Sequence, residues 1–158
     1  MKKLIVLSAI AALTSGAALA DSINLGAAVQ SVCGVSNTET VKYFPALALG
    51  NSATVNFNLQ CNDVDGATIS LTTSEGHLQN SDNEDMGVGY TAALSAGPFA
   101  FTLTADDGAN DQSASQSQAG TAALAAGGLA GTILVTVTQT PTWSGTYADT
   151  LTLGITAN

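Results

Sequence analysis

Short runs in which apolar and polar residues alternate recur along this chain, and they constrain its fold more than any other feature. Successive side chains of a β-strand point to opposite faces, so this alternation predicts strands with one buried and one exposed face. Thr, Asn and Ser fill most of the alternate positions, as is typical of antiparallel sheets that pack one face on a core. The runs are at 55–61, 67–72, 99–104, 133–138 and 147–156. We therefore predict an all-β protein.

Residues typical of turns separate these runs. They are clusters of Asp, Gly, Pro, Asn and Ser at 62–66, 97–98, 106–108 and 141–145. Shorter candidate strands lie at 40–44 and 88–93, whereas 106–130 has the composition of a long flexible connection with room for an extra short strand. Within it, 121–129 is a candidate helix that Gly127-Gly128 interrupts. About seven short strands punctuated by turns predict an immunoglobulin-like sandwich.

Residues 1–20 have the pattern of a secretory signal peptide. Lys2 and Lys3 precede an apolar run at 4–13, and Ala18-Leu19-Ala20 forms a cleavage site of the small-x-small type. The run is too short for a transmembrane helix. Cleavage after Ala20 would leave 158 − 20 = 138 residues, enough for one domain with a real core.

The predicted mature chain is strongly acidic. Of three basic side chains only Lys42 lies outside the signal peptide, against twelve acidic ones, so the net charge is 1 − 12 = −11. Such a charge repels phosphate backbones and anionic lipid, which argues against nucleic-acid binding and membrane insertion. The apolar content of 46% is unlike that of a disordered acidic tail.

Cys33 and Cys61 are the two cysteines of the chain. In an exported protein an isolated pair favours a disulfide, whereas a metal site or a redox motif needs closer spacing or histidine partners. We therefore predict a Cys33–Cys61 bridge, which would contribute on the order of 3 kcal/mol to stability.

Nothing in the sequence indicates catalysis. His77 is the sole histidine, and it lies in the polar stretch 74–78, which predicts an exposed loop position. There is no Gly-x-Ser-x-Gly motif, and the predicted disulfide would use both cysteines. We predict that the protein is not an enzyme and has no cofactor.

Acidic residues offer weak candidates for a calcium site. Aligning Asp63-Val64-Asp65-Gly66 with an EF-hand loop places Cys61 and Thr72 where carboxylates belong, so that match fails. Two further clusters could supply oxygen ligands, although solvated turn carboxylates are the commoner case: Asp82, Glu84 and Asp85, or Asp106, Asp107 and Asp111.

Two aromatic residues, Trp143 and Tyr147, flank Gly145 before the last predicted strand. Exposed aromatic side chains could contact a sugar or another protein. More often such residues plug the end of a sandwich, and we predict that role for both.

The two ends of the predicted mature chain raise a joint question. Near its start, apolar side chains alternate with small and polar ones at Ile23, Leu25, Ala27 and Val29. After the last predicted strand only Ala157 and Asn158 follow, so we expect no further strand to cover its edge. A spare strand and an exposed, apolar-faced edge are what donor-strand complementation requires. The alternative is that the first strand pairs within its own sheet.

Residues 144–153, Ser-Gly-Thr-Tyr-Ala-Asp-Thr-Leu-Thr-Leu, resemble the closing Gly-x-Tyr-x-Asp-Thr-(apolar)-x-(apolar) signature of the spore coat protein U domain family. That family includes the pilin subunits of archaic chaperone–usher pili. The signal peptide, the short alternating segment and a first cysteine in Cys33-Gly34-Val35 are similar too, as is a second cysteine that ends a strand.

This resemblance implies an immunoglobulin-like sandwich that lacks one strand and is completed by a donor strand. It divides the chain into a signal peptide (1–20), a donor segment (21–32) and one pilin domain (33–158). The donor side chains would be Ile23, Leu25, Ala27 and Val29, and the acceptor groove would have one wall from Leu151, Leu153 and Ile155. Cys33 and Cys61 would again form the bridge.

The function that the resemblance implies is that of a structural subunit of a surface pilus, which supports adhesion or biofilm formation. Its partners would be neighbouring subunits, a periplasmic chaperone and an outer-membrane usher, and it would reach the cell surface through the periplasm. The alternative is a self-complete secreted β-sandwich that binds calcium, carbohydrate or a surface partner.

Overall fold

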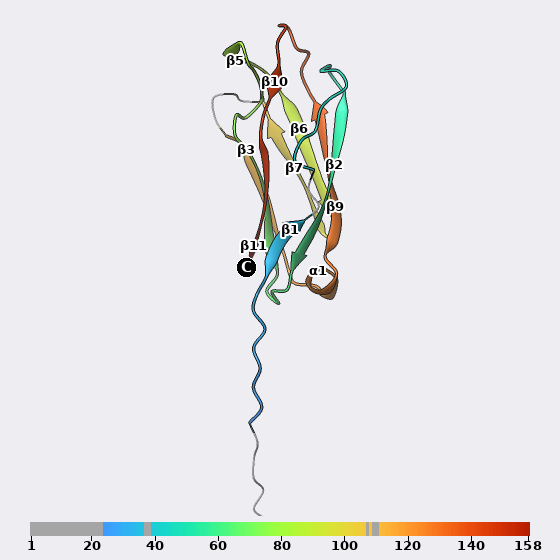
Figure 1. Ribbon diagram of the computed structural model, residues 1–158, viewed down its shortest axis with the longest axis vertical. Helices are drawn as coiled ribbons and strands as arrows, with labels where there is room; N and C mark the ends of the chain where they lie inside the picture. Colours follow the sequence, from blue (N-terminus) through green and yellow to red (C-terminus); the bar gives the residue numbers. More distant parts are fainter. Residues whose placement is uncertain (1–23, 37–38, 107, 109–110) are drawn as a thin grey trace, which may run out of the picture.

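The structure, a computed structural model, describes residues 24–36, 39–106, 108 and 111–158, apart from the side chains of residues 83–85. Regular structure in this part of the chain is almost entirely β (Figure 1). One short helix, α1 (Ala122–Ala126), precedes the ninth strand. The strands are β1 (Cys33–Ser36), β2 (Ser52–Cys61), β3 (Ala67–Thr73), β4 (Leu78–Asn80), β5 (Asn83–Val88), β6 (Tyr90–Ala96), β7 (Phe99–Ala105), β8 (Ser113–Gln118), β9 (Leu129–Val137), β10 (Tyr147–Ala148) and β11 (Leu151–Ala157).

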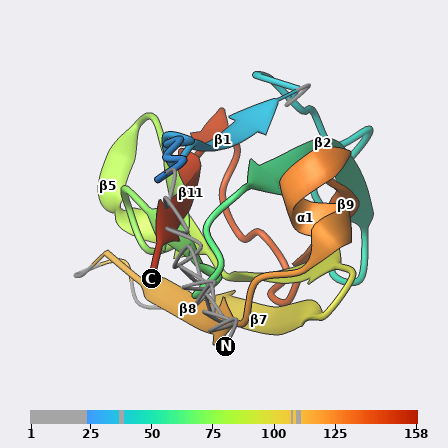
Figure 2. The same ribbon diagram turned by 90° about the horizontal axis from the view of Figure 1, so that it is seen from below.

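Two antiparallel sheets face each other and form a sandwich. The larger has the strand order β1-β2-β9-β6-β7, and the other has the order β11-β3-β8. A small third sheet, β10-β4-β5, extends one end of the molecule (Figure 1). Seen along the long axis, the strands enclose a common interior (Figure 2). The predicted all-β sandwich is confirmed.

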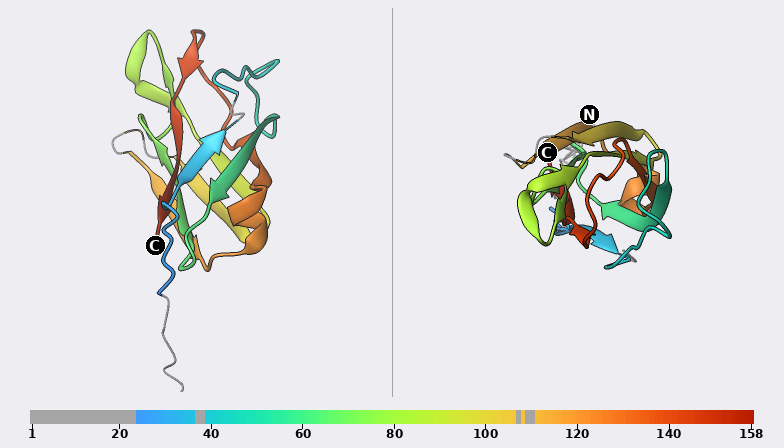
Figure 3. Two further views of the ribbon diagram at one scale, coloured as in Figure 1. Left: turned by 60° about the horizontal axis from the view of Figure 1, so that its bottom comes forward. Right: turned by 90° about the horizontal axis from the view of Figure 1, so that it is seen from above.

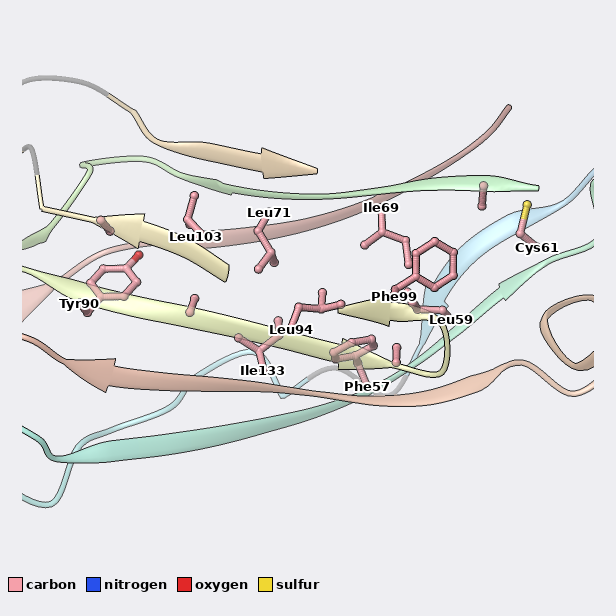
Figure 4. Close-up of a cluster of buried hydrophobic side chains, with 14 of the residues drawn as sticks. Phe57, Leu59, Cys61, Ile69, Leu71, Tyr90, Leu94, Phe99, Leu103 and Ile133 are labelled. Carbon is pink, nitrogen blue, oxygen red and sulfur yellow. The ribbon is translucent and has the colours of Figure 1, made fainter. Parts of the chain in front are cut away.

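Apolar side chains of the alternating runs fill the space between the two sheets (Figure 4). In β3, Ala67, Ile69 and Leu71 are fully buried, while the residues between them are half-buried. From the facing sheet, β2 contributes Phe57 and Leu59 to the same core. Burial of one large apolar side chain is worth about 1.5–3 kcal/mol, so this shared interior holds the sheets together.

The five alternating runs lie in strands, as predicted, except at Thr138 and at residues 149–150. Their inward faces are the buried ones, because one face of each sheet packs on the core. The runs 55–61, 67–72 and 99–104 belong to β2, β3 and β7, the run 133–138 lies in β9 except for its last residue, and the run 147–156 is divided between β10 and β11.

The range 106–130 holds the extra short strand and the candidate helix that the sequence allowed, so less of it is irregular than its composition predicts. Strand β8 occupies part of it and pairs with β3 over six residues. Its Ser, Gln and Ala residues conceal it in the sequence, because an edge strand needs few apolar side chains. Helix α1 also forms there, with the Thr121 hydroxyl accepting from the Leu124 N–H at 3.1 Å and Leu124 buried, and it ends before Gly127-Gly128.

Two shorter predictions also need correction. Residues 40–44 form no strand, although Phe44 packs against the core from a loop. The candidate 88–93 is two strands, since β5 ends at Val88 and β6 begins at Tyr90. The described residues form eleven strands rather than about seven, since short pieces such as β4 and β10 carry too few residues to show an alternation.

The predicted disulfide between Cys33 and Cys61 is present. These residues face each other in register at one end of the β1–β2 ladder, and Cys61 is fully buried. The bridge therefore fixes the short strand β1 to the edge of the larger sheet.

Candidate functional site

The sandwich is closed along one side by polar side chains. The Gln116 side-chain oxygen accepts from the Ala100 N–H at 2.7 Å, and the Gln118 amide donates to the Pro98 carbonyl at 3.1 Å. These bonds join β8 to β7 and its preceding turn, and the two strands lie side by side here. We call this contact the β7–β8 seam.

On the opposite side of the sandwich two strand edges face each other. Strand β1 pairs with β2 only at residues 58–61, so residues 52–57 of β2 have no partner strand on their outer side among the described residues. Strand β11 pairs with β3 on one side, and no described strand pairs with its other side. The backbone groups along both edges are therefore available to a further strand.

An apolar groove of about 330 Å³ lies between these edges. Val55 of β2 and Leu151 and Leu153 of β11 form its walls, and Ile133 and Val135 of β9 also line it. At its rim the Lys42 ammonium lies 2.8 Å from the Glu39 carboxylate. A second cavity of about 450 Å³ shares Lys42 and Phe44 with the groove and continues it toward β10.

Two of the three predicted acceptor residues line the groove. Leu151 and Leu153 line the groove and are half-buried. Ile155 lies further along β11, opposite Ile69 of β3, and packs against the core without lining the groove.

The predicted donor residues lie away from the groove. Ile23 is outside the described residues. Leu25 and Val29 are 93% and 87% exposed, and Ala27 is exposed as well. The segment runs away from the domain below β1 (Figures 1 and 3) and pairs with no strand of the described chain. The alternative, in which this segment forms a strand in a sheet of its own domain, is therefore not the arrangement in the structure.

Asp149, just before β11, organises a polar cluster at the groove wall. Its Oδ1 accepts from the Ser74 N–H (3.2 Å) and hydroxyl (3.1 Å), from the Glu75 N–H (3.1 Å) and from the Thr150 N–H. Its Oδ2 accepts from the Tyr90 hydroxyl at 2.8 Å. The carboxylate thus ties the start of β11 to β6 and to the loop after β3. Sequence analysis placed Asp149 only within a family signature, and its partners, up to 75 residues away, give no local signal.

Burial and the neighbouring Asp149 carboxylate raise the pKa of Tyr90 well above its ordinary value. A raised pKa in the folded state means that the folded chain keeps this proton at a pH where the unfolded chain loses it. The contribution to stability is therefore complete below about pH 10, and it declines above that pH by up to about 1.4 kcal/mol per unit.

We expect the urea midpoint to fall between about pH 10 and 11 more steeply for the native chain than for Tyr90→Phe. Tyr43→Phe is the matched control, since Tyr43 is 84% exposed. Equal slopes for the native chain and Tyr90→Phe would contradict the assignment.

The prediction of an exposed His77 is wrong. The side chain is buried, and its Nε2 has no hydrogen-bond partner among the described residues. The ring lies against the backbones of Gly87 and Gly108, where a Cβ would collide with it. Glycine therefore makes the space for this ring, which a polar local sequence does not indicate.

Trp143 does not plug the end of the sandwich as predicted, because its side chain is 59% exposed. Tyr147 is half-buried against the core, and its hydroxyl donates to the Trp143 carbonyl at 2.8 Å. The turn between them therefore directs one aromatic ring inward and the other outward.

The calcium candidates are only partly within the described chain. Asp82 is exposed and lies beside Asn80, while the side chains of Glu84 and Asp85 and all of Asp107 lie outside the described part. The described residues contain no group of three or more His, Cys, Asp or Glu side chains placed to hold a metal ion.

Comparison with protein-family models and with curated proteins finds no match to this chain. No helix among the described residues is long and apolar enough to cross a membrane.

Proposed function

We propose that this protein is a structural subunit of a surface pilus and is assembled by donor-strand exchange. The observation that carries the proposal is the coexistence of two unfilled strand edges across an apolar groove and an alternating segment outside every described strand. The segment of one copy would fill the groove of the next. The resemblance of residues 144–153 to the closing signature of pilin subunits supports the same function.

The dimensions of the segment suit the groove. Residues 23–29 span about 20 Å as an extended strand, one residue more than the free β2 edge at 52–57, which spans about 17 Å. Alternate side chains along such a strand are about 6.6 Å apart and would all face the groove. Side chains of Ile23, Leu25, Ala27 and Val29 would meet Val55, Leu151 and Leu153.

The direction of the incoming strand follows from which end of the groove is open. At one end β1 occupies the β2 edge and lies near β11, whereas the other end continues into the second cavity. A segment whose C-terminal end is attached to another domain must enter from the open end, with its N-terminal end toward β1. Since β2 and β11 both run from the open end toward β1, the donor would be antiparallel to both (Figure 1).

Charge favours association at these edges. No charged residue occurs in β2 or β11, and residues 22–32 are uncharged too. Exposed edge strands that avoid pairing commonly carry lysine or other charges. The strands of the proposed contact therefore lack that protection, and the charged residues of the groove lie outside β2 and β11, at Glu39, Lys42 and Asp149.

Before assembly an open apolar groove needs temporary cover. In the proposed pathway a periplasmic chaperone supplies a strand to β11, and an outer-membrane usher then exchanges it for the segment of the next subunit. The signal peptide predicted at residues 1–20 would direct the chain to that compartment and would then be removed.

Two aspartate substitutions test the proposal in combination. Leu25→Asp should abolish donation and Leu153→Asp should abolish acceptance, because each would bury an unpaired carboxylate in the groove. Each variant alone should stay monomeric, while a mixture should form dimers and stop there, since one intact segment and one intact groove remain. Size-exclusion chromatography with light scattering measures this outcome.

Neighbouring residues that point the other way provide matched controls. Asn24→Asp and Thr152→Asp add the same charge beside the altered positions, and Thr152 is exposed, so both variants should polymerise like the native chain. Polymers from either single groove or donor variant, or a mixture that remains monomeric although both variants are folded, would refute the proposal.

A further inference from the structure

The leading segment, residues 21–32, is tied to its own domain at its root. The Asn62 side chain bridges two backbone groups of the segment: its Oδ1 accepts from the Val32 N–H at 2.6 Å, and its Nδ2 donates to the Gln30 carbonyl at 2.9 Å. The Asn62 N–H donates to the Val32 carbonyl at 3.2 Å. The Ser31 hydroxyl donates to an Asp63 carboxylate oxygen at 3.2 Å. We call these four bonds the Asn62 clamp.

The clamp prolongs the β1–β2 ladder by means of a side chain. Paired residues of that ladder end at Cys33 and Cys61, and Asn62 follows directly. A carboxamide carries an acceptor oxygen and an NH₂ donor, much as a peptide group carries a C=O and an N–H. It can therefore form hydrogen bonds with backbone groups on both sides of Ser31, as a neighbouring strand would. Upstream, Leu25 and Val29 are almost fully exposed. The boundary between the fixed and the free part of the segment therefore lies between Val29 and Gln30.

This attachment sets the direction of the free part. Strand β1 runs from Cys33 toward the groove, and the clamped root continues its line the opposite way, so the free part points away from the groove (Figures 1 and 3). Length does not prevent a return, since residues 21–29 reach about 30 Å when extended. To enter its own groove the segment would have to reverse at residues 30–32, which would break the clamp.

We infer that Asn62 is a positioning residue that keeps the leading segment out of its own groove and so presents it to a second copy of the chain. The inference rests on the proposed function for the role of the groove. The clamp itself is a property of the single chain, and it can be tested without any assembly.

Asn62→Ala tests both parts by NMR, on the monomeric fraction of the mature chain isolated by size-exclusion chromatography and kept dilute. In the native protein, backbone order parameters at residues 31–32 should be about 0.85, and those at 24–28 should be below about 0.6. In the variant, the order parameters at residues 30–32 should fall clearly below their native values, although the backbone bond to the Val32 carbonyl and the Ser31–Asp63 bond remain. The closed population should rise about tenfold or more, because the net stabilisation from two hydrogen bonds is lost. It would appear as a second set of Leu151 and Leu153 methyl signals that does not depend on concentration.

Control variants keep the test decisive. Gln60→Ala removes an exposed carboxamide two residues before Asn62 that donates to the Ala125 carbonyl and not to the leading segment, and it should leave both readouts at native values. Asn62→Gln moves the carboxamide by one methylene and should act like the alanine variant, which provides a second test if Asn62→Ala is poorly folded.

Unchanged order parameters at 30–32 in both Asn62 variants would overturn the clamp. Increased mobility with a single set of leucine methyl signals would overturn the directing role. Failure of the Leu25→Asp and Leu153→Asp mixture to form dimers would count against the pilus function and leave the order-parameter result standing, so the two failures are distinguishable.

Discussion

Replacement of both Cys33 and Cys61 by serine is expected to lower the free energy of unfolding by about 3–4 kcal/mol. The bridge joins residues 28 apart in sequence, so its loss releases a long loop in the unfolded chain. It also leaves β1, only four residues long, without its covalent attachment to the larger sheet. Urea denaturation followed by circular dichroism measures the change.

An alanine pair at the same positions separates two causes. Cys61 is fully buried, so serine there adds a buried hydroxyl, whereas alanine does not. If loss of the cross-link dominates, both pairs should be destabilised to within about 1 kcal/mol of each other. A loss below about 1 kcal/mol for the alanine pair would show that the bridge contributes little.

Substitution of Asp149 by alanine should be about as damaging, with a loss of about 3–5 kcal/mol. The carboxylate accepts bonds from three backbone N–H groups and two hydroxyls, and hydrogen bonds to charged groups are the stronger ones. Its removal leaves the buried Tyr90 hydroxyl without this acceptor. Equilibrium denaturation near neutral pH provides the measurement.

Asp149→Asn and Asp82→Ala define what the charge contributes. The asparagine keeps one acceptor oxygen and should recover part of the loss. Asp82 is exposed, and among the described residues its side chain accepts one long bond, from Ser81, so its alanine variant should lie within about 0.5 kcal/mol of the native chain. If Asp149→Ala matched Asp82→Ala, the polar cluster would have no part in holding β11.

The sequence predicts strands well where one face is strongly apolar. Ile69 and Leu71 in β3, and Phe99 and Leu103 in β7, alternate with polar residues, and all four are buried. Strand β8 could be anticipated only as room for a short strand within 106–130, because its outer positions are serines and its inner ones are Ala114 and two glutamines, so no hydrophobic period locates it.

Long-range polar partners were beyond sequence reasoning for a different reason. The carboxamide of Asn62 forms hydrogen bonds with Val32 and Gln30, which precede it by 30 and 32 positions. The Tyr90 hydroxyl donates to Asp149, which follows it by 59 positions. Such pairs depend on which strands become neighbours. The burial of His77 is similar, because it depends on two glycines that the fold brings to either side of its ring.

The β7–β8 seam has a mechanical consequence. The hydrogen bonds of the Gln116 and Gln118 side chains can break one after the other. In the β6–β7 ladder, by contrast, the backbone hydrogen bonds of seven residue pairs share a shearing force. A force that pulls the two sheets apart will therefore separate them along this seam before it separates neighbouring strands within a sheet. The two sheets therefore separate preferentially at the β7–β8 seam, which lies opposite the β2 and β11 edges that an added strand would join.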